Sequence, residues 1–178
     1  QGTRVYYPDP MANAPQKIDI AAHLHRSGRL NEAEQMYTDI LAKDKRNCIA
    51  LSLLGTLYIQ TGQAERALPY LQKASSINPR NAEFINNLGA AYHHMGKTDD
   101  AIKRYQQAVR MHPNYPEALN NLGAVLLQTG RSAEGIPHLE SALRLSPDYL
   151  QAHENLAKAY RATGRGAEAI PHYEAALL

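Results

Sequence analysis

The chain is short of cysteine, net charge and long apolar runs, and each shortage excludes a class of protein. Its one cysteine, Cys48, can form no internal disulfide, which favours a reducing, cytoplasmic compartment. With 19 lysines and arginines against 17 aspartates and glutamates, the formal charge of +2 is too small to gather the phosphates of a nucleic acid. No apolar stretch is long enough to span a bilayer, so we expect no membrane insertion.

The sequence also lacks the signatures of catalysis and metal binding. It has no glycine-rich phosphate loop, no nucleophile elbow and no cysteine cluster. His93 and His94 are adjacent, and adjacent residues on a helix diverge by about 100 degrees, so they do not converge on one ion. We therefore expect solvated surface histidines, no metal, no cofactor and no catalytic residue in this chain.

What the sequence does contain is a repeat of 34 residues. One series with this spacing consists of five glycines: Gly28, Gly62, Gly96, Gly130 and Gly164. Two further series share the period and hold only small residues: Ala21, Gly55, Gly89, Gly123 and Ala157 in the first, and Ala33, Ala67, Ala101, Gly135 and Ala169 in the second. Several series with one period indicate a structural repeat.

Each unit is predicted to be two helices that meet at the glycine, because apolar residues recur at helical spacing on both sides of it. In the third unit we expect helices over residues 82–95 and 98–111, with Thr98 as the N-cap of the second. Gly96 would end the first helix in a left-handed conformation that costs little only for glycine. Such short helices are unstable alone, so the hairpins must stack. The predicted fold is an all-α, right-handed α-solenoid of about five hairpins.

These series resemble the consensus of the tetratricopeptide repeat (TPR) family, which has small residues at its eighth, twentieth and twenty-seventh places and proline at its thirty-second. Pro79, Pro113 and Pro147 stand at that last place. The resemblance covers a domain of residues 14–178 with units 14–47, 48–81, 82–115, 116–149 and 150–178, the last one truncated. Residues 1–13 form an N-terminal extension, either a tag or a segment whose Val5, Tyr6 and Tyr7 supply a ligand for a groove.

Asparagine recurs on the first helices of the last three units, as Asn87, Asn121 and Asn155, with Asn86 and Asn120 directly before two of them. Asparagine is a modest helix former, so helix propensity does not explain the series. Its amide carries donors and an acceptor, and can therefore bind both the N–H and the C=O of an extended peptide unit. Amides one hairpin apart, about 10 Å, would meet about every third residue of such a peptide. The alternative is that the amides bond across neighbouring repeats and stiffen the stack.

In this architecture the first helices line the concave surface. The asparagine series looks similar to the one inside the repeats of O-GlcNAc transferase, and this resemblance implies backbone binding by Asn87, Asn121 and Asn155. Around them we expect further peptide contacts from the other polar residues of the groove: Asn86, Asn120, Glu83, His93, His94, Glu117, Gln128, Glu154, Lys158 and Arg161. Toward the N-terminus the equivalent places hold Ser52 and Leu53, so the amide series is expected to fade there.

The expected function is binding of an extended polypeptide segment in the concave groove. Two alternatives stay open: the acceptor-recognition arm of a larger glycosyltransferase or sulfotransferase, as the similarity to bacterial TPR-containing transferases implies, and a self-assembling scaffold. The carboxylate clamp of chaperone-binding repeats is excluded, because Glu117 stands where that clamp needs lysine and would repel a carboxylate. The last unit stops without a polar capping helix, so we expect either a longer protein or a homodimer that covers the uncapped C-terminal face.

Overall fold

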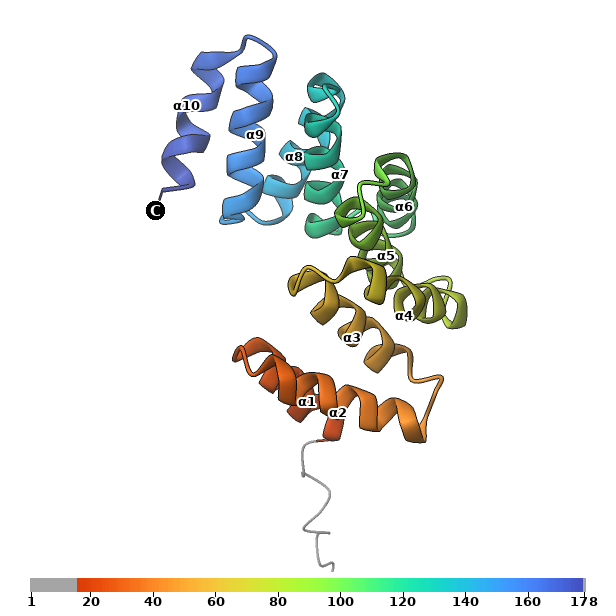
Figure 1. Cartoon of the computed structure of the whole chain (residues 1–178). Helices are drawn as coiled ribbons and strands as arrows, with labels where there is room; N and C mark the ends of the chain where they lie inside the picture. Colours follow the sequence, from red (N-terminus) through yellow and green to blue (C-terminus); the bar gives the residue numbers. More distant parts are fainter. Residues whose placement is uncertain (1–15, 178) are drawn as a thin grey trace, which may run out of the picture.

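The computed structural model describes residues 16–177, which form ten α-helices joined by short turns (Figure 1). The helices pack in order as five hairpins, and each hairpin also contacts the next. The all-α solenoid of about five hairpins predicted from the sequence is confirmed. Within the described residues the helices are α1 (Lys17–Arg26), α2 (Leu30–Lys43), α3 (Cys48–Gln60), α4 (Ala64–Ile77), α5 (Ala82–His94), α6 (Thr98–Met111), α7 (Pro116–Gln128), α8 (Ser132–Leu145), α9 (Leu150–Ala162) and α10 (Gly166–Ala175).

A glycine in the left-handed conformation follows the first helix of every hairpin. In the third hairpin the Gly96 N–H donates to the His93 carbonyl (2.9 Å) and the Lys97 N–H donates to the Tyr92 carbonyl (2.9 Å), which closes the end of α5. A side chain would be strained at this backbone conformation, so the turn itself requires the glycine series. The φ angles are 79° at Gly28, 73° at Gly62, 71° at Gly96, 76° at Gly130 and 77° at Gly164.

The turn after the glycine is shorter than the sequence suggested. The second helix of the third hairpin begins at Thr98, as predicted, but its N-cap is Lys97 and no side chain caps it. The prediction that Thr98 is the N-cap was therefore wrong, because only Lys97 separates Gly96 from the helix. The first helix of this hairpin does have a side-chain cap, since Asn81 Oδ1 accepts from the N–H groups of Glu83 and Phe84.

Small residues let the two helices of each hairpin cross closely. A Cβ atom added to Gly89 of α5 would lie 2.8 Å from Cε1 of Tyr105 in α6, so the glycine makes room for that ring. In the fourth hairpin both crossing residues are glycines, and a Cβ atom on Gly135 would lie 2.8 Å from the Gly123 carbonyl oxygen. Close crossing buries one large side chain on each of four second helices: Tyr37, Leu71, Tyr105 and Leu139.

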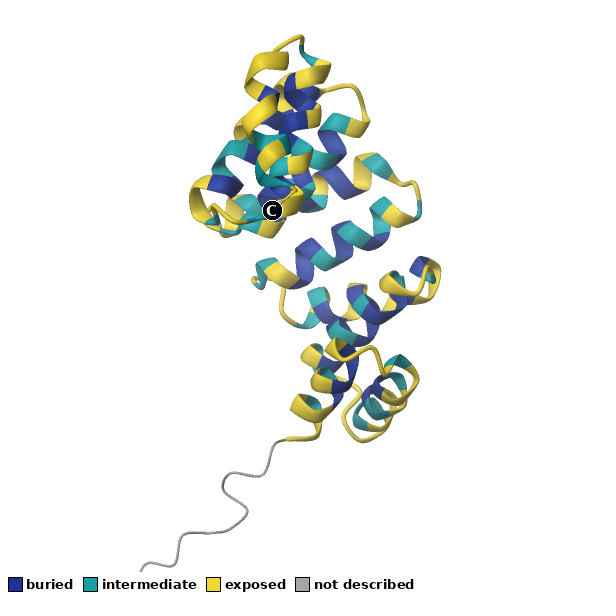
Figure 2. Cartoon of the chain, turned by 90° about the vertical axis from the view of Figure 1, so that its left-hand side faces the viewer, coloured by how far each residue is buried: buried dark blue, intermediate teal, exposed yellow. Residues whose placement is uncertain are grey.

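The buried residues run along the interior of the whole array, and the exposed residues cover its outside (Figure 2). Each hairpin thus covers an apolar face of its neighbour, as in other one-dimensional repeat arrays. Large apolar side chains are exposed on the last hairpin, where Ile170 is 57% and Leu177 is 88% accessible. No helix among residues 16–177 is long and apolar enough to cross a membrane.

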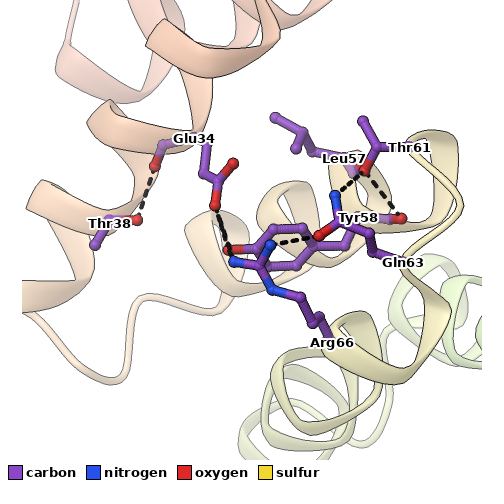
Figure 3. A network of polar contacts seen from close by, with 7 residues as sticks. All are labelled: Glu34, Thr38, Leu57, Tyr58, Thr61, Gln63 and Arg66. Atoms are coloured by element: carbon purple, nitrogen blue, oxygen red, sulfur yellow. Dashed lines mark hydrogen bonds and ion pairs between the residues drawn. The ribbon is translucent and has the colours of Figure 1, made fainter.

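Polar side chains also join neighbouring hairpins, and the clearest case links the first two (Figure 3). The Tyr58 hydroxyl of α3 donates to Glu34 Oε1 of α2 at 2.7 Å. Arg66 of α4 donates to both oxygens, at 2.8 and 3.1 Å, and its guanidinium lies 4.1 Å from the centre of the Tyr58 ring. Burial, reinforced by the bond to Glu34, raises the pKa of Tyr58 to about 12. The same arrangement of tyrosine and carboxylate recurs between Tyr160 and Glu140.

Several histidines belong to the packing and not to the solvated surface. His25 is 9% exposed, with its Nε2 2.7 Å from Gln60 Oε1 of the next hairpin. The Nδ1 atoms of His153 and His172 lie 2.9 Å apart and join α9 to α10. For His25 the prediction of a solvated surface histidine was wrong, because stacking buries its ring against the next hairpin. Within the described part of the chain, no group of three or more His, Cys, Asp or Glu could hold a metal ion.

The histidine contact between α9 and α10 makes the last hairpin sensitive to acid. Burial, followed by the charge of His153, lowers the pKa of His172, so the folded hairpin favours the neutral imidazole. This contribution to stability is present above the ordinary histidine pKa of about 6.5 and is lost as the pH falls through the lowered pKa. We therefore expect hydrogen exchange in α10, corrected for the intrinsic rate and referenced to α4, to accelerate between pH 7.5 and pH 5. His172→Gln should remove this acceleration, and an equal acceleration in that variant would contradict the assignment.

Candidate functional site

The asparagine series lies on three consecutive first helices. Asn87, Asn121 and Asn155 occupy the same place on α5, α7 and α9 and are half-buried. We call these three residues the amide ladder. Each donates from Nδ2 to the preceding first helix: Asn87 to Ser52 Oγ (3.1 Å), Asn121 to Asn86 Oδ1 (3.0 Å) and Asn155 to Asn120 Oδ1 (2.9 Å). Bonding across neighbouring repeats, the alternative that the sequence left open, is thus present.

These cross-repeat bonds use only part of each amide. A side-chain amide has two N–H donors and an oxygen with two acceptor positions. In the described residues, Asn121 and Asn155 each use one donor, and their Oδ1 atoms accept no hydrogen bond. Asn87 also accepts a long bond of 3.5 Å from Asn86. The solenoid therefore fixes the orientation of each ladder amide and leaves donor and acceptor capacity at a half-buried surface.

The residues directly before the ladder serve it as supports. Asn86 and Asn120 are each 5% exposed and Ser52 is 2% exposed, so these side chains present almost no surface to a ligand. We place Asn86 and Asn120 among the acceptors that hold the ladder, and not among direct peptide contacts. Ser52 accepts the bond from Asn87 in the same way. The series of supporting acceptors therefore begins one unit before the first asparagine.

Two tyrosines beside the ladder were missed by the sequence reasoning. Tyr149 lines a cavity of about 400 Å³ together with Glu117, and Tyr115 lines one of about 430 Å³ together with Glu83. The Tyr149 hydroxyl lies 3.5 Å from Asn120 Nδ2. Burial, followed by the charges of Glu83 and Glu117, raises the pKa of Tyr115. Their spacing of 34 residues, two places after a repeat proline, was the available signal.

The remaining predicted residues lie on the same first helices, and most of them pair with each other. His93 Nε2 lies 2.6 Å from Gln128 Oε1 of the next first helix, and the exposed His94 ring is 5.9 Å from that of His93. Lys158 pairs with Glu154 at 2.5 Å within α9. Arg161, near the end of α9, is exposed. The site thus offers neutral amides beside two pockets that are each lined by a tyrosine and a glutamate. Charged residues of both signs surround them.

A sequential stack of hairpins, with a row of partly satisfied amides on its first helices, places the protein in the class of helical-repeat interaction proteins. Profiles of the tetratricopeptide repeat match residues 24–84, 70–103, 91–130 and 115–177, and together they run without a gap from residue 24 to residue 177. The chain therefore belongs to the tetratricopeptide repeat family. Domains of this family bind protein partners, and the chain is a protein-interaction module.

Solved structures of other repeat proteins share the fold over most of the chain. The crystal structure of MamA matches with a TM-score of 0.73 and 26% identity, over 89% of this chain and 93% of that one. A thermophilic TPR protein from Thermus thermophilus matches with a TM-score of 0.80 and 23% identity, over 90% and 88% of the two chains. PilF from Pseudomonas aeruginosa gives 0.80 and 21%, over 90% and 73%. The last two likenesses are evidence of fold alone.

One curated relative matches a short part of the chain. The Protein CTR9 homolog of Arabidopsis thaliana is 39% identical over 56 residues, which make up 32% of this chain and 5% of that protein. The chain thus spans a small fraction of this relative's length.

Proposed function

We propose that the protein binds an extended polypeptide segment along its first helices, with the amide ladder contacting the backbone of the ligand. The observation that carries this proposal is the state of the three amides, which are oriented by one cross-repeat bond each and keep further hydrogen-bonding capacity. We include as flanking contacts the polar residues around the ladder: Glu83, His93, His94, Glu117, Gln128, Glu154, Lys158 and Arg161.

Two physical arguments support backbone recognition. A side chain already fixed by the fold loses little conformational entropy when a ligand binds, which favours affinity. The ladder amides are one hairpin apart, about 10 Å by helix-packing distances, so an extended chain that rises about 3.3 Å per residue meets one amide at every third residue. Side chains of the ligand are not read by such contacts, and the bound sequences should therefore vary widely.

The direct test follows the side-chain amide resonances of the ladder by NMR. We expect the Nδ2 signals of Asn87, Asn121 and Asn155 to shift when a degenerate mixture of twelve-residue peptides is added. The same mixture with N-methylated backbone amides should shift them much less. N-methylation removes the peptide N–H groups that would donate hydrogen bonds to the Oδ1 atoms of the ladder. Binding that leaves these three signals unmoved would sink the proposal.

Substitution of the ladder provides the quantitative prediction. The triple variant Asn87→Ala, Asn121→Ala and Asn155→Ala should weaken binding of the peptide mixture at least about ten-fold, the effect of 1.4 kcal/mol. It should also lose about 0.5–1.5 kcal/mol of stability for each cross-repeat bond removed. Ser52→Ala is the matched control, because it removes the partner of Asn87 and keeps every ladder amide. We expect Ser52→Ala to lower stability and to weaken binding much less than the triple variant does in titrations, and a triple variant with unchanged affinity would refute the assignment.

A further inference from the structure

A small apolar pocket opens at the junction of the first two hairpins, and no residue of the amide ladder lines it. Its volume is about 190 Å³, and its lining residues come from α2, the turn after it, α3 and α4: Leu41, Lys45, Leu51, Pro69, Tyr70 and Lys73. Pockets for drug-sized ligands begin at about 300 Å³. This pocket therefore fits a single side chain of a ligand. Two of its lining residues, Lys45 and Lys73, carry an ammonium group.

The apolar walls of the pocket belong to the packed interior. Leu51 is 3% exposed and packs with Ala74 and Phe84, and Leu41 and Tyr70 pack against the same cluster. The Tyr70 ring lies 5.7 Å from the ring of Tyr58, which Glu34 and Arg66 hold in place. Because these walls are held by core contacts, the pocket is formed before any ligand arrives.

The period of the chain provides an internal comparison for the two lysines. At the three later junctions, proline stands at the place of Lys45, and a neutral residue stands at the place of Lys73: Pro79 with Gln107, Pro113 with Ser141, and Pro147 with Ala175. The place of Tyr70 holds Arg104, His138 and His172. The repeat fold thus requires neither lysine, and an apolar pocket between two cations is particular to the first junction.

Both ammonium groups are available to a ligand. The ion pairs among residues 16–177 involve neither Lys45 nor Lys73, and both residues are exposed. Exposed pairs add little affinity by themselves, but they select the charge of a partner and its register. An apolar side chain in the pocket would supply binding, and carboxylates beside it would meet the two lysines.

We propose that this pocket docks a partner protein through a segment in which one apolar side chain is flanked by aspartate or glutamate residues. The pocket and the amide ladder share no residue, so one partner can engage the first junction while a peptide lies along the later first helices.

The test measures fluorescence anisotropy with two labelled synthetic peptides. One carries a central leucine between pairs of acidic residues, and the other carries the same leucine between pairs of lysines. We expect the acidic peptide to bind in a salt-dependent manner and the basic peptide to bind at least about ten-fold more weakly. The double variant Lys45→Glu and Lys73→Glu should weaken the acidic peptide by a similar factor. Lys97→Glu with Lys103→Glu is the matched control, which makes the same charge change away from the pocket and should leave affinity unchanged.

A second variant probes the apolar wall with a residue that the repeat carries at two later junctions. Tyr70→His introduces the residue that later junctions carry at this place, so the hairpin should fold normally by circular dichroism and still bind the acidic peptide more weakly. The triple asparagine variant should bind this peptide like the unaltered protein, which separates the two proposals. The docking proposal fails if the acidic peptide does not bind, if both peptides bind equally, or if reversal of the two lysine charges has no effect.

Discussion

Tyr105→Ala will lower the free energy of unfolding by about 3–5 kcal/mol, the usual cost of removing a large aromatic side chain from a core. The ring is 2% exposed and fills the space that Gly89 leaves at the crossing of α5 and α6. Gly89 has no side chain that could fill this space, so the substitution leaves a cavity at the crossing. Urea denaturation, analysed with a model that treats each hairpin as one unit, provides the measurement.

The repeat itself supplies the control for this prediction. Leu71 and Leu139 occupy the place of Tyr105 in two other hairpins, each opposite a glycine, and both are fully buried. Tyr105→Leu should therefore cost less than about 1.5 kcal/mol, as other exchanges of similar apolar volume do. If the leucine variant is as unstable as the alanine variant, a property of the tyrosine other than its volume stabilises this crossing.

Gly135→Ala will destabilise the fourth hairpin by about 1–3 kcal/mol, although four other hairpins carry alanine at this place. The new methyl group would lie 2.8 Å from the carbonyl oxygen of Gly123, and a backbone atom cannot move aside as a flexible side chain can. The two helices would have to separate. Hydrogen exchange should then increase in α7 and α8 before it increases in α3 and α4.

Gly166→Ala is the matched control for this prediction. Gly166 begins α10, and a Cβ atom built there meets nothing within 4 Å. The same glycine-to-alanine change should therefore be neutral, or stabilise by up to about 1 kcal/mol, because alanine is the better helix former. A loss of stability at Gly166 equal to that at Gly135 would show that close crossing is not the cause.

The fold was predictable because its two strictest backbone demands are visible as residue types. A positive φ angle selects glycine at Gly96 and its equivalents, and a close crossing selects a small residue at Gly89 and its equivalents. Both demands recur with every hairpin, so the same glycine and small-residue positions appear several times in one sequence. Thr98 shows the limit, since the N-cap depends on the exact length of one turn and no repeated residue reports it.

The candidate site was only partly predictable, because spatial neighbours on successive first helices are 35 residues apart and the sequence repeat is 34. Alignment of the units places Asn87, Asn121 and Asn155 in one column and suggests that equal places face the same ligand. The actual hydrogen bonds join Asn86 to Asn121 and Asn120 to Asn155, one place out of register. This offset arises from the packing of the helices, so the supporting role of Asn86 and Asn120 could not be inferred from the period.

The same offset gives the array a mechanical property. The bonds from the amide ladder span the second, third and fourth junctions between hairpins, one bond to each, so they act in series along the axis. A force that pulls the two ends apart would load the ladder bond of each of these junctions together with the apolar packing around it. Among the described residues, the first junction has no bond from the amide ladder. It is joined by His25 with Gln60 and by Tyr58 with Glu34, and equivalent pairs recur later in the chain as His93 with Gln128 and Tyr160 with Glu140. A pulling force would therefore open the first junction without a ladder bond to resist it, while each later junction would have one.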